Sequence, residues 1–142
     1  MSTAVMPSAE QTTGLKALTA SAVATLDLLL DKASRNVRSR VSEGDRISSR
    51  SMEAEQRATH GLAWFATYVE SLRQLDAYAS RLSEQDRYGE LEEIIVRLGF
   101  GEYLAQVFGG IPMNQGEFVR LSDLGLTATD IAAGRSEDID EL

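Results

Sequence analysis

The chain contains no cysteine, one histidine and only two prolines among its 142 residues. Without cysteine it can form no disulfide, no thiolate nucleophile and no cysteine-based zinc site, and a single histidine excludes multi-histidine metal sites. An excess of basic residues is also missing, because Lys and Arg number 14 against 22 Asp and Glu, for a formal net charge of −8. This balance argues against nucleic acid as a partner, since neutralising phosphates requires clustered basic residues.

Long uncharged apolar runs are absent as well. No segment is long enough to span a bilayer, and the polar start lacks the apolar core of a signal peptide. We therefore expect no membrane partner and a cytoplasmic location. At 43% hydrophobic residues the chain can build a core, and its length suits one domain.

The main positive feature is a helical repeat of apolar residues. Steps of three and four place one set on a single helical face: Leu15, Leu18, Ala22, Leu26, Leu29, Ala33, Val37 and Val41. The small, polar residues 1–14 predict a flexible leader. No glycine or proline interrupts residues 15–43, and Gly44 provides a stop.

Two further helices are expected after a serine-rich break at 47–51. The second should cover residues 52–82, and the polar residues 83–86 resemble a capping box that opens the third. Gly99 and Gly101 lower helix stability and predict a kink or a break in that third helix. Its end is predicted at Gly109-Gly110, since a glycine pair followed by proline cannot continue a helix.

The remaining residues predict an irregular segment over 111–126, a short helix over 127–134 and a frayed acidic tail over 137–142. No stretch shows the clean alternation of a strand. The predicted fold class is all-α: one helical domain over 15–136, forming an antiparallel helical bundle with a kinked third helix and an irregular C-terminal segment.

Few residues offer chemistry. His60 has no thiol to activate, and an ordinary surface or packed role is favoured over catalysis. The acids between 84 and 93 crowd a helix start, where the helix dipole favours them without any metal or acid–base role. The basic residues between Lys32 and Arg50 either form a solvated helix end or bind an anionic group such as a phosphate or a partner's carboxylates. We assign no catalytic residue and no metal ligand.

One run of residues resembles a known motif. Residues 105–110, Ala-Gln-Val-Phe-Gly-Gly, are similar to the Gln-x-x-Gly-Gly motif in the C-terminal helical domain of flavin-dependent acyl-CoA dehydrogenases. Residues 60–73 resemble the long helix of that domain. Phe118-Val119-Arg120 together with Asp123 resembles its Arg-Asp segment. Gly134-x-Ser136 resembles the Gly-Thr-Ser that follows the catalytic glutamate. Order and approximate spacing agree from Ser51 to Ile139.

The resemblance implies FAD as cofactor of the parent enzyme and Gln106, Gly109 and Gly110 as contacts to its adenylate side. It also shows departures, because Ala133 stands where many members have the catalytic glutamate. Alanine cannot remove the proton beside a thioester carbonyl. The family's N-terminal helical domain and β-domain have no counterpart in this chain.

A narrower resemblance covers nearly the whole chain. Residues 101–106 and 109–117 are similar to the N-terminal helical extension of (2S)-methylsuccinyl-CoA dehydrogenases. This implies a non-catalytic accessory domain of an FAD-dependent enzyme that dehydrogenates an acyl-CoA thioester between its α and β carbons. Its expected partners are a downstream dehydrogenase body or a neighbouring subunit in a homo-oligomer. The alternative is a free-standing helical homo-oligomeric interaction module, indicated by the heptad-like stripes of the first two helices.

Overall fold

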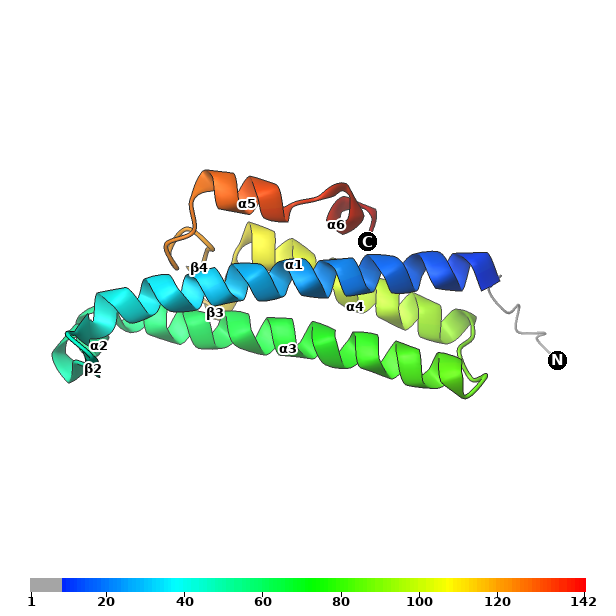
Figure 1. Ribbon diagram of the computed structural model, residues 1–142, viewed down its shortest axis with the longest axis horizontal. Helices are drawn as coiled ribbons and strands as arrows, with labels where there is room; N and C mark the ends of the chain where they lie inside the picture. The colour runs from blue at the N-terminus through cyan, green and yellow to red at the C-terminus, as the bar shows by residue number, and fades with distance from the viewer. Residues whose placement is uncertain (1–8) are drawn as a thin grey trace.

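Three long helices lie side by side in the computed structural model, which describes residues 9–142, with side chains from Gly14 onward (Figure 1). They are α1 (Ala9–Val41), α3 (Gln56–Glu84) and α4 (Glu90–Gly109). Short connections make successive helices antiparallel, and α3 packs against both α1 and α4. The short helices α5 (Ala128–Gly134) and α6 (Glu137–Glu141) lie against α1. The predicted mostly helical bundle is therefore confirmed.

A single core runs between these helices. Its largest fully buried side chains are Phe65 on α3 and Phe100 on α4. The predicted stripe of α1 is buried along nearly its whole length: Leu15, Ala22, Leu26, Leu29, Ala33, Val37 and Val41. None of the described helices is both long and apolar enough to cross a bilayer.

The first helix begins earlier than predicted. It starts at Ala9, so residues 9–14 of the predicted leader are helical, while residues 1–8 lie outside the described part of the chain. Ala9 to Thr13 contain no helix breaker, and a helix already nucleated by the packed stripe extends at little cost. The predicted second helix is divided at Glu55 into α2 (Ser49–Ala54) and α3.

The break predicted in the third helix does not occur, because α4 continues as one helix through Gly99 and Gly101. Close packing explains Gly99: a Cβ atom there would lie 2.5 Å from Cδ2 of Leu75 on α3. Glycine is thus placed where two helices approach closely, and the packing offsets its low helix propensity. The start of α4 is also later than predicted, at Glu90 after the N-cap Gly89.

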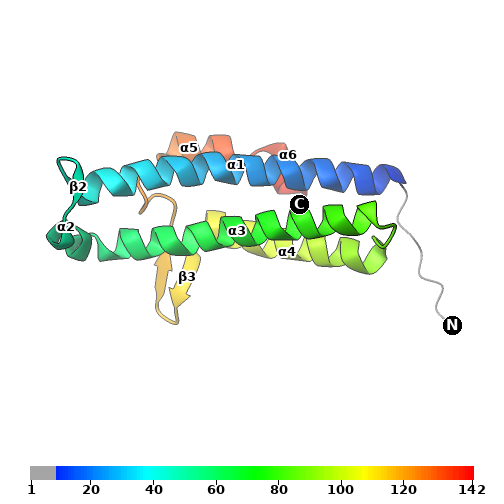
Figure 2. The same cartoon turned by 60° about the horizontal axis from the view of Figure 1, so that its bottom comes forward.

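Two small hairpins correct the expectation that the chain has no strands (Figure 2). The first, β1 (Ser42–Glu43) with β2 (Arg46–Ile47), turns at Gly44, whose φ of +62° favours glycine. The second, β3 (Ile111–Asn114) with β4 (Glu117–Val119), lies inside the segment predicted to be irregular. Strands of two to four residues are too short to show a periodicity in sequence.

The C-terminal segment is ordered by tertiary contacts, so the predicted frayed tail is wrong. Thr127 caps α5 as predicted, and its hydroxyl accepts the N–H of Asp130. Residues 137–141 form α6, with Ile139 buried and Asp138 accepting a 2.7 Å hydrogen bond from Ser21 on α1. An acidic composition alone predicts fraying, whereas Ile139 anchors the segment to the core.

Asp130 makes the stability of this C-terminal segment depend on pH. Its pKa is lowered from 3.8 to about 2, first by the hydrogen bond from Lys32 and then by those from Thr127. A depressed folded-state pKa stabilises the fold above pH 4, and this stabilisation is lost as pH falls toward 2. We expect Asp130→Asn to flatten the acid limb of the unfolding free energy, measured by urea denaturation between pH 6 and pH 2.

The Lys32→Met variant is the matched test of this cause, because it removes the other half of the same 2.5 Å ion pair. It should flatten the same limb, and the double variant should add little to either single change. An acid limb that stays as steep as in the wild type would contradict the assignment to Asp130.

Candidate functional site

A shallow groove runs along α4 from Ile94 to Gly109. One part, of about 560 Å³, is lined by residues of α4 from Ile94 to Gln106 together with Leu142. The adjoining part, of about 370 Å³, lies between α4 and α6 and is bordered by Gly109, Arg135 and Asp140. The groove is open to solvent and mostly apolar, which suits a surface that another protein covers better than a closed ligand pocket.

Gln106, the first residue predicted to touch a cofactor, already has a partner within the fold. The hydroxyl of Tyr68 on α3 donates a short hydrogen bond to its Oε1. The Tyr68 ring also packs on Tyr103, with ring centroids 4.6 Å apart. Burial, and secondarily Tyr103, raises the pKa of Tyr68, so its hydroxyl stays protonated and able to donate at neutral pH. Gln106 therefore joins α3 to α4.

Gly109 and Gly110 have different surroundings. Gly109 has no heavy atom within 4 Å of where a Cβ would lie, so its backbone is open to approach. Gly110 adopts φ of +138°, lies beneath the side chains of Phe118 and Arg120, and donates its N–H to the carbonyl of Gln106 at 2.7 Å. Of the two glycines, Gly109 has the more open surroundings. Gln106 lines one part of the groove and Gly109 the other, so their contact with a cofactor stays a prediction.

The position that the motif resemblance assigns to the family's catalytic glutamate lies on helix α5. Ala132 and Ala133 both face solvent. The nearby carboxylates form ion pairs within the chain: Asp130 pairs with Lys32 at 2.5 Å, and Asp140 pairs with Arg135 at 2.8 Å. No other group takes the place of the general base on this helix.

The remaining candidate residues have structural partners. His60 is exposed, and its Nε2 accepts a 3.0 Å hydrogen bond from the indole of Trp64 one turn later. Glu92 accepts the N–H of Gly89 at the start of α4, as expected for acids at a helix N-terminus. Among the described residues no cluster of three His, Cys, Asp or Glu side chains could hold a metal ion.

Some residues of the predicted basic stretch form ion pairs and hydrogen bonds within the chain. Arg40 donates to the carbonyl of Asp123 at 2.9 Å and lies 3.6 Å from Glu55, while Arg35 pairs with Asp31 on the same helix. Arg40 thus connects α1 to the loop before α5 and to Glu55 at the start of α3. A solvated helix end and a site for an anionic group both stay predictions for this stretch.

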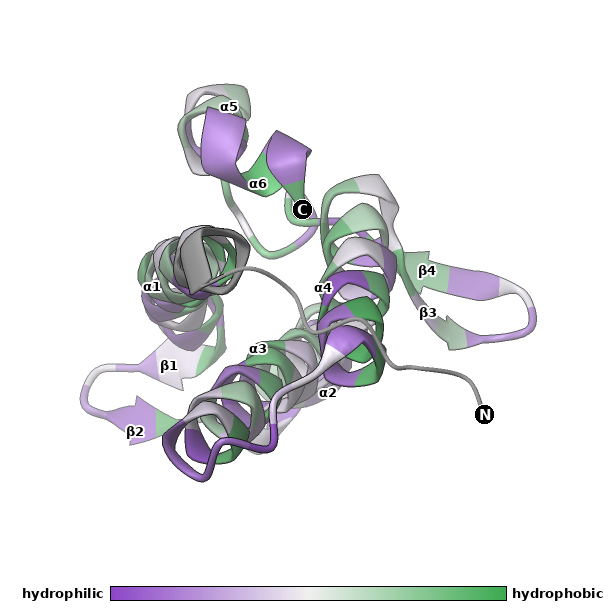
Figure 3. Ribbon diagram, turned by 90° about the vertical axis from the view of Figure 1, so that its right-hand side faces the viewer, coloured by the Kyte–Doolittle hydropathy of each residue, from purple (hydrophilic) through white to green (hydrophobic). Residues whose placement is uncertain are grey.

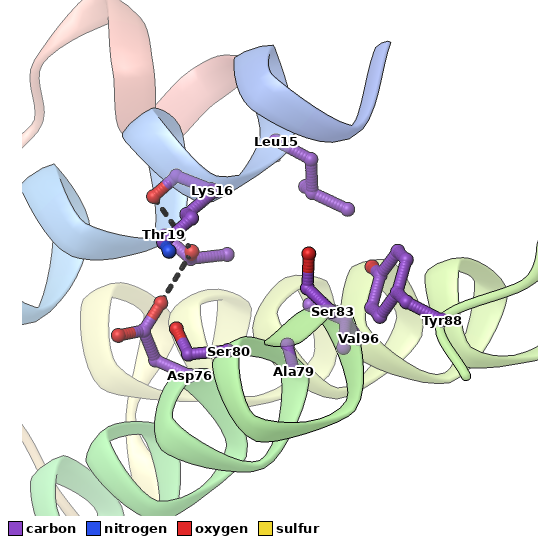
Figure 4. A pocket seen from close by; sticks show the side chains of 9 residues that line it. All are labelled: Leu15, Lys16, Thr19, Asp76, Ala79, Ser80, Ser83, Tyr88 and Val96. Atoms are coloured by element: carbon purple, nitrogen blue, oxygen red, sulfur yellow. Dashed lines mark hydrogen bonds between the residues drawn. The ribbon is translucent and has the colours of Figure 1, made fainter. Parts of the chain in front are cut away.

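A separate small cavity lies between α1, α3 and the start of α4 (Figure 4). Its volume of about 20 Å³ fits one water molecule. The buried Thr19 hydroxyl lies 2.6 Å from Oδ1 of Asp76 beside it, and burial raises the pKa of Tyr88 on its wall to about 12. This cavity is too small for a substrate and serves the polar contact between α1 and α3.

The feature that sequence reasoning missed is the outer surface of α4. Four large apolar side chains there are exposed: Leu91, Ile94, Ile95 and Leu98. A signal was present in the sequence, because α4 has more apolar positions than one buried face accommodates, which is typical of a helix covered on more than one side. In the structure the opposite side of the helix packs against the bundle, through Val96, Phe100, Leu104 and Val107.

Comparison with known proteins identifies one relationship. No family model matches the chain. Over 112 residues it is 46% identical to (2S)-methylsuccinyl-CoA dehydrogenase of Cereibacter sphaeroides. The chain is similar to part of this dehydrogenase. The match takes in 79% of the chain but 20% of the dehydrogenase, so the chain spans about a fifth of its relative's length. The resemblance to methylsuccinyl-CoA dehydrogenase predicted from the motifs is confirmed.

Proposed function

We propose that the chain is a non-catalytic helical accessory module of the methylsuccinyl-CoA dehydrogenase type, which serves packing or assembly of the enzyme in the cytoplasm. The observation that carries the proposal is the 46% identity to one fifth of the dehydrogenase. We place the matching segment in the N-terminal extension of the relative, as the motifs indicate.

The geometry around the family motifs supports a role without catalysis. Gln106 bonds to Tyr68, Gly110 lies under Phe118, and α5 carries the exposed Ala133 in place of a carboxylate. In this proposal FAD and the acyl-CoA thioester belong to the dehydrogenase body, which supplies the base and takes the hydride onto flavin. The motif residues of this chain are kept for helix packing.

The first test measures the chain by itself. Purified chain with FAD, methylsuccinyl-CoA and an artificial electron acceptor should show no acceptor reduction above buffer, and FAD absorbance should not change on titration. The Ala133→Glu variant should be equally inactive, because a carboxylate on an exposed helix has no enclosed substrate to act on. Turnover by the unaltered chain would overturn the proposal.

The second test measures the accessory role in the enzyme. Exchanging the matching fifth of the Cereibacter sphaeroides dehydrogenase for this chain should leave kcat and KM within about threefold of the parent, a difference of roughly 0.7 kcal/mol or less. A chimera with the parent's subunit mass and activity supports the proposal. A chimera that folds and binds FAD but loses more than a hundredfold in kcat would show that the segment takes part in the chemistry.

A free-standing homo-oligomeric interaction module is the second candidate. It is favoured by the exposed apolar side chains on α4, which a monomer leaves in water. The chimera separates the two candidates, because a free-standing module gives no reason for it to assemble with a dehydrogenase body.

A further inference from the structure

The C-terminal segment runs along α1 in the opposite direction, and side chains of α1 bind it at four levels (Figure 1). In order from the end of α1, Arg40 donates to the carbonyl of Asp123 at 2.9 Å, Asn36 to the carbonyl of Gly125 at 2.8 Å, Lys32 to Asp130 at 2.5 Å and Ser21 to Asp138 at 2.7 Å. Positions 32, 36 and 40 lie on one side of the helix because they are four residues apart. The donors descend along α1 as the acceptors advance along the chain, so these contacts fix the position of the whole segment.

Burial divides this segment into two unequal parts. Residues 121–126 carry three buried leucines: Leu121, Leu124 and Leu126. Residues 127–142 carry one buried large apolar side chain, Ile139, and most residues of α5 and α6 are exposed. Because burial of apolar surface is the main favourable contribution to folding, the second part is held more weakly than the first. The boundary between the two parts lies between Leu126 and Thr127.

The helices of the second part are too short to be stable by themselves. Helix α5 has seven residues and α6 has five, and isolated helices of fewer than about 12 residues are marginal in water. The contacts that bind them to α1 are polar and partly open to solvent, since the side chain of Lys32 is 44% exposed. Water replaces such contacts at little net cost. A segment of this kind opens locally at a lower free energy than the core.

We propose that residues 127–142 form a strap, which opens as one unit at the junction of Leu126 and Thr127 and gates the part of the α4 groove beside α6. The end-on view of Figure 3 places α6 on one side of the bundle, between α1 and α4. In the closed state Gly134 of the strap lies so close to α1 that a Cβ atom there would be 2.7 Å from Cδ1 of Leu29. The strap thus covers both helices at once.

Opening uncovers apolar surface on both of these helices. In the closed state Ile139 and Leu29 are each 6% exposed, and Leu104, on the wall of the groove beside α6, is 4% exposed. The two parts of the groove share residues of α4 together with Leu142, so they form one continuous surface. Opening therefore enlarges an apolar surface that is already partly accessible. A molecule that binds the uncovered part would shift the strap toward its open state by the difference in its affinity for the two states.

The strap regulates how much of α4 is available for packing, and in this respect the inference rests on the accessory role proposed above. Its experiments use the chain alone and need no dehydrogenase. A strap that stays closed, in a chain that still functions in the chimera, would overturn the inference and leave the proposed function standing. A strap that opens, in a chain whose chimera loses activity, would support the inference and overturn the proposed function.

Thiol labelling measures opening directly, because the chain has no cysteine of its own. One cysteine at a time is introduced by Ile139→Cys on the strap, Leu104→Cys on the wall of the groove or Val69→Cys in the core face of α3. The thiols at positions 139 and 104 should react with an aromatic disulfide reagent at similar rates, at least about tenfold faster than the thiol at position 69, because local opening uncovers them. Circular dichroism checks that each variant keeps its helices. A thiol at position 104 that reacts as slowly as the one at position 69, or as fast as a free thiol, would overturn the gate.

The Lys32→Met variant tests whether the strap moves as one unit, because Lys32 contacts Asp130 on α5 and does not line the groove. Removing this exposed ion pair should speed labelling at positions 139 and 104 together, by roughly two- to fivefold, and leave position 69 unchanged. The control is Lys16→Met, the same change on α1 beside the small cavity, which should alter none of the three rates. Faster labelling at position 139 alone, or at neither position, would overturn the proposal of a single unit.

Trypsin provides a measurement on the unaltered chain. Arg135 connects α5 to α6 and its side chain is 61% exposed, yet cleavage after it requires the neighbouring residues to leave the bundle. Mass spectrometry should show the loss of residues 136–142 before any cleavage after Arg35, whose side chain is 65% exposed within α1. Cleavage at the two sites at equal rates would show that the strap opens only when the whole bundle unfolds, and would overturn the inference.

Discussion

Replacing Phe100 by alanine is expected to lower the free energy of unfolding by about 3–5 kcal/mol. Phe100 is fully buried on the inner side of α4, and the cavity left by its ring would be lined by a core that can collapse only partly. Urea denaturation followed by the fluorescence of Trp64, the single tryptophan, measures this loss. The result tests which side of α4 belongs to the bundle.

Phe118→Ala is the matched control, because it removes the same side chain from a site that is 47% exposed on the β3–β4 hairpin. Its expected cost is about 1 kcal/mol or less. Equal losses at the two positions would contradict the placement of the core between α3 and α4.

Replacing Gly61 by alanine is expected to lower the free energy of unfolding by about 1–3 kcal/mol. A Cβ atom at Gly61 would lie 2.9 Å from Cβ and 3.1 Å from Cγ1 of Val119, which is itself fully buried on β4. Because the obstructing atoms include a Cβ fixed to the backbone, the hairpin has to move away from α3. The change therefore reports on the contact between the second hairpin and the bundle.

Gly109→Ala is the control for this substitution. Gly109 also lies in a helix, but the space around it is open, so the gain in helix propensity should leave stability unchanged or raise it by up to ~1 kcal/mol. A Gly61→Ala variant as stable as the wild type would show that Val119 yields without cost.

The long helices were predictable because their signal is local. The stripe from Leu15 to Val41 repeats over about seven turns of α1, and all but Leu18 of its residues are buried. Thr127 and Asp130 likewise cap α5 with side chains three residues apart. Such features depend on spacing along the chain, which the sequence states in full.

The misassigned elements depend on contacts between distant residues. Gly99 is compatible with a continuous helix because Leu75 of another helix fills the space beside it, and Ile139 orders the acidic tail by reaching the core. Neither contact has a signature in the local sequence. The hydrogen bond from Tyr68 to Oε1 of Gln106 likewise joins residues far apart in the sequence.

By itself the sequence determined the helical class, the absence of thiol chemistry and the resemblance to methylsuccinyl-CoA dehydrogenase. These properties follow from composition, periodicity and motif order, which are defined along the chain and do not depend on tertiary contacts. Only the tertiary structure decided which apolar residues of α4 are core and which are surface. Leu98 and Phe100 are both strongly hydrophobic in the sequence, and burial is a property of what packs against each of them.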